Sequence, residues 1–66
     1  MIVEVEKESD GRFIAEVPAV PGALAYGESQ DAAVAKVEAL VLRILADRLD
    51  NGEDTSEISE VFTVAA

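Results

Sequence analysis

The sequence predicts a single α+β domain, a small antiparallel sheet with one long helix packed across it, in the order β-β-β-α-β. Three observations predict this fold: two runs that alternate apolar and polar residues, an Asp-Gly turn between them, and one long helical pattern after Ser29. A chain of 66 residues is enough for one domain, but it buries only about 60% of the surface that its unfolded form exposes. We therefore expect one domain over residues 1–66, stabilised further by association between copies.

The first two strands are predicted to form a hairpin. Residues 1–7 alternate so that Val3 and Val5 share the buried face, and residues 12–17 alternate again. Asp10-Gly11 lies between the two runs, and this dipeptide accepts the positive φ angles of tight turns. The buried face of the second strand is predicted to hold Phe13, Ala15 and Val17.

A corner and a third strand are predicted next. Pro18 and Pro21 each remove a backbone donor and restrict the residue before them, so the sheet cannot continue through this stretch. Residues 23–26 are short and apolar, and Gly22 and Gly27 bound them. We expect this segment to pair back onto the second strand.

A helix is predicted from Ser29 to about Leu49 or Asp50. The Ser29 hydroxyl suits the N-cap, and Asn51-Gly52 suits the end of a helix. The side that faces the sheet is predicted to hold Val34, Val37, Val41 and Ile44. The polar side is predicted to hold Lys36, Arg43, Asp47 and Asp50.

Leucines beside the core side of this helix widen its apolar surface. Either a second subunit covers them or the C-terminal segment folds over them. For the first case we predict an oligomer interface at Leu42, Leu45 and Leu49. After an acidic loop at residues 53–60, the β-prone residues 61–65 are predicted to form a last strand at the sheet edge, paired within the subunit or with a neighbour.

The charge balance bears on the partners of the chain. Fourteen acidic against five basic residues give a net charge of −9, which repels a phosphate backbone. We therefore expect no direct binding of nucleic acid. The acidic surface suits a basic protein partner, or it serves solubility alone.

Composition also argues against an enzyme, a cofactor or a metal site. The sequence has no histidine and no cysteine, so the commonest general base, the thiol nucleophile and the usual zinc ligands are missing. The acids Glu4, Glu6 and Glu16 alternate with buried positions as on any solvent-facing strand, and Asp10 belongs to the turn. No apolar run reaches the ~20 residues of a membrane span, and no secretion signal begins the chain, so we expect a cytoplasmic protein.

One stretch carries a family resemblance. Residues 10–40, DGRFIAEVPAVPGALAYGESQDAAVAKVEAL, place a hairpin turn, a strand, a Pro/Gly-rich corner and a helix start in immediate succession. In this order the chain resembles the HicB family, antitoxins that bind and silence HicA toxins, which are small RNases acting on mRNA. The resemblance implies a truncated RNase H-like fold. It carries over as fold markers Asp10, Gly11, Pro18, Pro21, Gly22, Gly27 and Ala33.

The resemblance implies a function as well. We expect a HicB-like antitoxin domain that covers the RNA-binding surface of a small basic toxin, with carboxylates in place of phosphates. Fuller members of the family carry a C-terminal DNA-binding module, which we do not expect within residues 1–66. The predicted partner-binding residues are Glu4, Glu6, Arg12, Glu16 and Tyr26.

Two other functions stay open. The first is a stand-alone interaction module that forms a homo-oligomer, a dimer or tetramer, without a toxin partner. The second is a small-ligand or regulatory domain that uses a cleft beside residues 18–21. A neighbouring gene for a small basic RNA-binding protein would favour the antitoxin over both.

Overall fold

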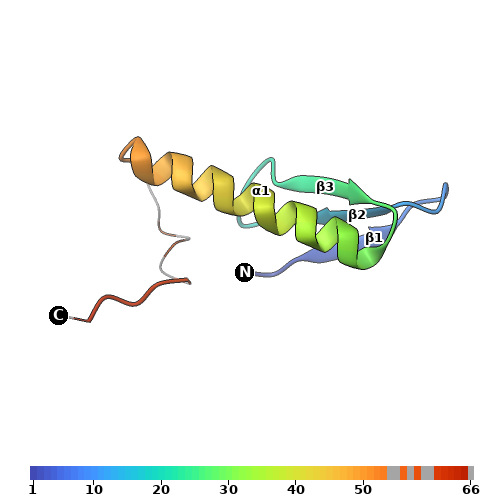
Figure 1. Cartoon of the computed structure of the whole chain (residues 1–66), viewed down its shortest axis with the longest axis horizontal. Coiled ribbons are helices and arrows are strands. Elements are labelled where there is room, and N and C mark those ends of the chain that lie inside the picture. The colour runs from blue at the N-terminus through green and yellow to red at the C-terminus, as the bar shows by residue number, and fades with distance from the viewer. Residues whose placement is uncertain (54–55, 57, 59–60, 66) are drawn as a thin grey trace.

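The computed structural model in Figure 1 describes residues 1–53, 56, 58 and 61–65. Three strands form one antiparallel sheet in the spatial order β1-β2-β3, and one helix packs across a single face of it, mainly against β3 and β2. The elements are β1 (Glu4–Lys7), β2 (Phe13–Glu16), β3 (Leu24–Gly27) and α1 (Gln30–Asp50). The α+β fold with a helix across an antiparallel sheet is thereby confirmed.

The Asp-Gly turn joins β1 to β2. Glu8 N–H donates to the Arg12 carbonyl at 2.7 Å, and Gly11 adopts a φ of +91° between them. The Asp10 carboxylate accepts a hydrogen bond from Arg12 N–H at 3.0 Å, an Asx-type bond that fixes the turn. The hairpin therefore forms where the sequence predicts it, because its turn is held by residues two to four positions apart.

The Pro/Gly-rich corner is part of the core. Val17 N–H donates to the Ala23 carbonyl at 3.1 Å, and Val20 N–H donates to the Val17 carbonyl at 3.0 Å. These bonds tuck Val20 inward, where it is fully buried, while Gly22 completes the turn with a φ of +88°. The corner thus sets the direction of β3 and also adds a core side chain.

Both ends of α1 are capped as the sequence predicts. The Ser29 hydroxyl accepts a hydrogen bond from Ala32 N–H at 3.1 Å. At the other end, Gly52 N–H donates to the Leu49 carbonyl and Glu53 N–H donates to the Arg48 carbonyl, with Gly52 at a φ of +68°. This pair of bonds is the Schellman arrangement, in which a glycine after the C-cap ends the helix.

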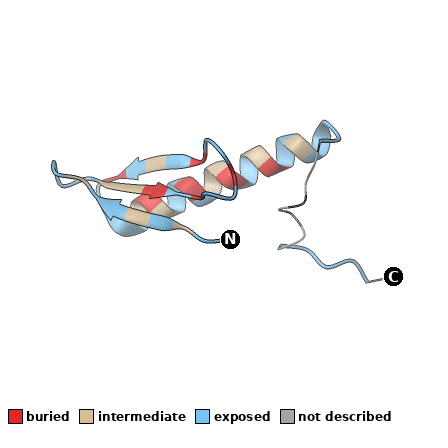
Figure 2. Cartoon of the chain, turned by 180° about the vertical axis from the view of Figure 1, so that it is seen from behind, coloured by how far each residue is buried: buried red, intermediate tan, exposed pale blue. Residues whose placement is uncertain are grey.

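The core lies between α1 and the inner face of the sheet (Figure 2). Its buried members are Ala15, Val17, Val20, Ala23, Ala33, Val37, Val41 and Leu45. Val3, Val5, Phe13, Val34 and Ile44 are half-buried. Gly27 is also buried, because β3 passes so close to the start of α1 that a Cβ there would lie 2.9 Å from the Ala32 carbonyl carbon.

The structure corrects two predictions. Leu45, expected at a subunit interface, is 1% exposed and belongs to the core, which Ile58 also contacts. The prediction of a last strand is also wrong: Val61 lies in a turn, and none of the described residues 61–65 belongs to a strand. The predicted acidic loop at residues 53–60 lies largely outside the described residues, which include only Glu53, Ser56 and Ile58 of this range.

Candidate protein-binding face

The face of the sheet opposite α1 gathers all five residues predicted to bind a partner. Because side chains alternate along a strand, the cross-strand register fixes which residues share this outer face. One row across the sheet contains Glu4, Glu16 and Leu24, and the next contains Glu6, Ile14 and Tyr26. Arg12 precedes β2 in the same alternation and continues this face toward the turn.

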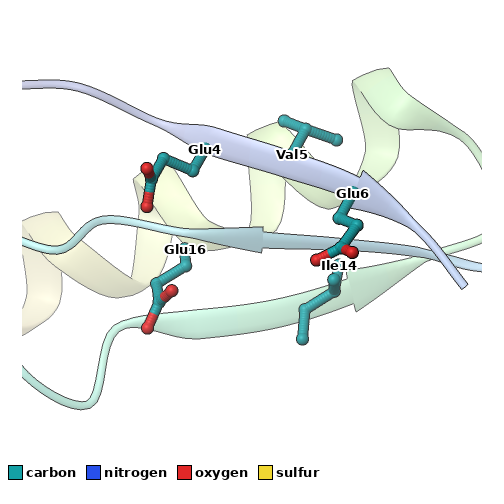
Figure 3. A pocket seen from close by; sticks show the side chains of 5 residues that line it. All are labelled: Glu4, Val5, Glu6, Ile14 and Glu16. Atoms are coloured by element: carbon teal, nitrogen blue, oxygen red, sulfur yellow. The ribbon is translucent and has the colours of Figure 1, made fainter.

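One part of this face is an acidic strip, which we define as Glu4, Glu6 and Glu16. Glu4 lies directly opposite Glu16 on the neighbouring strand, and Figure 3 shows their side chains next to each other over a shallow hollow. All three side chains are exposed. Like charges directly opposite each other destabilise strand pairing, and a cationic partner between Glu4 and Glu16 would relieve this repulsion.

The other part is an apolar strip, which we define as Ile14, Leu24 and Tyr26. Ile14 is half-buried, whereas Leu24 and Tyr26 remain 41% and 40% exposed. Ile14 and Leu24 were not predicted from the sequence as residues of this face. The signal was present in the alternation, since Ile14 is in phase with Glu16 and Leu24 is in phase with Tyr26.

Arg12 joins the turn to the apolar strip. Its guanidinium carbon lies 4.7 Å from the centroid of the Tyr26 ring, within range of a cation–π contact. Its Nε donates to the Asp10 carboxylate at 2.8 Å. The Arg12 backbone N–H and then its side chain bond to this carboxylate, which lowers the pKa of Asp10 below its ordinary value.

The predicted oligomer residues lie away from this face. Leu42 and Leu49 are 61% and 51% exposed, and their spacing of seven places them on one side of α1. Leu42 borders an apolar hollow that Val41, Leu45 and Val61 also line. Two of the three leucines are therefore exposed, and the interface itself stays a prediction.

Over the residues that the structure describes, no group of three or more acidic side chains is placed to hold a metal ion. Pro18 and Ala19, beside which a ligand cleft was predicted, border an open hollow with Met1, Ile2 and Glu4. No helix in the described part of the chain is long and apolar enough to cross a membrane.

No protein-family model, no curated protein and no solved structure matches the chain.

Proposed function

We propose that this chain is a HicB-like antitoxin domain, which binds a small basic RNase in the cytoplasm and covers the surface with which that protein holds RNA. The observation that carries the proposal is the outer face of the sheet, where the acidic strip lies directly beside the apolar strip. A surface that binds RNA presents basic groups for phosphates and apolar or aromatic groups for bases. The two strips offer a complement to both.

The proposed inhibition is competitive. Glu4, Glu6 and Glu16 would take the places of RNA phosphates on the toxin, and Tyr26 would take the place of a stacked base. The net charge of −9 would speed the encounter with a basic protein, by an amount that salt reduces. Because the strips lie on a sheet held by backbone hydrogen bonds, the backbone that carries these side chains is ordered before binding, which limits the entropy lost on association.

The test is an affinity capture from the native cell lysate, with bound proteins identified by mass. The bait is compared with Glu4→Lys/Glu16→Lys, and with the control Asp47→Lys/Glu53→Lys, which makes the same charge change at exposed positions elsewhere. We expect the unaltered chain and the control to retain a small basic protein in near-equal amount, and the Glu4/Glu16 variant to lose it.

A second step decides whether the captured protein is a toxin. The purified partner should cleave RNA, and added chain should stop the cleavage at a one-to-one ratio. The proposal fails if the partner leaves RNA intact, or if the Glu4/Glu16 variant captures and inhibits it as well as the unaltered chain does.

A stand-alone homo-oligomer is the second candidate function. It is favoured by the exposed Leu42 and Leu49, which lie on one side of α1 and leave apolar surface in water. Recovery of only the bait's own oligomer in the same capture experiment would favour this function over the antitoxin.

A further inference from the structure

The two edges of the sheet differ in a way that bears on self-association. β1 and β3 are the outer strands, and in the part of the chain that the structure describes no other strand pairs with either of them (Figures 1 and 2). Each edge therefore presents backbone N–H and C=O groups that a further strand can pair with.

The register identifies which backbone groups are open at the edge of β3. Val17 N–H donates to the Ala23 carbonyl, so these two residues form a hydrogen-bonded pair. Successive residue pairs along an antiparallel ladder alternate between hydrogen-bonded and non-hydrogen-bonded, so Ala15–Ala25, two positions further along, is also a hydrogen-bonded pair. The backbone groups of Leu24 and Tyr26 then point away from β2. By the same alternation from Glu8–Arg12, those of Val5 and Lys7 point away from β2 at the edge of β1.

Charge separates the two edges. β1 has the sequence Glu-Val-Glu-Lys, and its self-pairing would bring carboxylates of two copies together. Charged side chains on an outer strand are a common protection against edge pairing. β3 has the sequence Leu-Ala-Tyr-Gly and lacks this protection.

We infer that two copies of this chain pair antiparallel along β3, forming a six-stranded sheet in the order β1-β2-β3-β3-β2-β1. Only one register lets the open backbone groups of both Leu24 and Tyr26 bond to the other copy. In this register Leu24 of each copy lies opposite Tyr26 of the other, and the two Ala25 residues face each other. Both Leu24–Tyr26 pairs are then bonded pairs, and four backbone hydrogen bonds join the copies.

The side chains favour a second copy as the occupant of this edge. In that register Leu24 and Tyr26, whose backbone groups are open, each lie opposite an apolar or aromatic residue of the other copy. The apolar strips of the two copies then form one continuous surface. A chain of net charge −9 repels its own copy wherever carboxylates approach, and the middle of this interface has none. The acidic strips stay open at the two far sides of the sheet, so their carboxylates do not take part in the dimer contact.

The first experiment is the solution mass, measured by light scattering after size exclusion at tens of micromolar. We expect about 14 kDa, twice the chain mass of 7.0 kDa. Leu24→Lys should reduce the mass to that of a monomer, because lysine on an edge strand opposes pairing. Leu42→Lys is the same substitution on the exposed side of α1, and it should leave the dimer intact.

The second experiment uses the unaltered chain, so it does not depend on a variant folding. Residue-resolved amide exchange should show protection at Leu24 and Tyr26 that falls as the protein is diluted. The amides of Val5 and Lys7, at the other edge, should exchange quickly at every concentration. A monomeric mass, a dimer lost in Leu42→Lys but kept in Leu24→Lys, or rapid exchange at Leu24 and Tyr26 would overturn the inference.

Discussion

The two halves of α1 have the same apolar periodicity but different surroundings. The first half, residues 30–41, lies on the sheet and buries small side chains, Ala33, Val37 and Val41. The second half, residues 42–50, extends past the sheet (Figure 1), since 21 helical residues span about 31 Å and four strand residues about 13 Å. There only Leu45 is buried. Periodicity therefore predicts which side of a helix is apolar, while the length of the sheet decides how much of that side is covered.

The strongest way to break the first half is Gly27→Ala. The added Cβ would meet the backbone at Ala32 and Ala33, so α1 must move off the sheet. We expect a loss of about 3 kcal/mol in the free energy of unfolding, measured by urea denaturation at one fixed protein concentration. Gly22→Ala is the control: its Cβ has open space, and the φ of +88° alone should cost about 1–2 kcal/mol. Equal losses would contradict the close approach.

The second half is tested by Leu45→Ala. Removing this buried side chain should cost about 2–3 kcal/mol, because the remaining contacts at the helix end relax into the space only in part. Leu42→Ala, a deletion of the same size at an exposed position, should change stability by less than about 0.5 kcal/mol. If both variants unfold at the same urea concentration, Leu45 does not anchor this half.

The junction between the sheet and the first half of α1 is tested by Ser29→Ala. The variant loses the hydroxyl that accepts the Ala32 N–H, and we expect a cost of about 1 kcal/mol in the thermal or urea transition. Ser29→Asp should restore most of it, because a carboxylate accepts the same bond and also opposes the helix dipole. A neutral Ser29→Ala would mean that water replaces the cap.

The free end of the second half should respond less to Gly52→Ala. The φ of +68° disfavours alanine, but the last turn can fray without opening the core. We expect a global loss below about 1 kcal/mol, with faster amide exchange at Gly52 and Glu53, whose N–H groups bond back to the helix. Unchanged exchange at both amides would contradict the capping arrangement.

The smallest effect is expected at the hairpin turn, far from both halves of α1. The pKa of Asp10 is lowered by its bonds to Arg12, so this carboxylate stabilises the fold at pH values above the ordinary aspartate pKa of about 3.9. The contribution is lost as the pH falls through the lowered pKa. The urea midpoint of Asp10→Asn should therefore lie slightly below that of the unaltered chain at pH 7, and the difference should shrink as the pH is lowered. A gap that persists in acid would assign the effect to the turn conformation.

Much of the candidate site was accessible from alternation alone. Glu4, Glu6 and Glu16 were predicted on one outward face, and the register places them there. The direct opposition of Glu4 and Glu16 was not predictable, because a one-residue change of register would pair different residues. The same limit hid the open backbone groups of Leu24 and Tyr26, which depend on how β3 pairs with β2.

The sequence by itself determined the features held by near neighbours along the chain: the Asp10-Gly11 turn, the Ser29 cap and the Gly52 stop. Each rests on hydrogen bonds between residues at most five positions apart, so the local pattern is sufficient. Only the tertiary structure decided that Leu45 is buried while Leu42 is exposed, and that residues 61–65 do not extend the sheet. Those outcomes depend on where segments distant in sequence meet, because burial and strand pairing require a partner surface that local propensity does not specify.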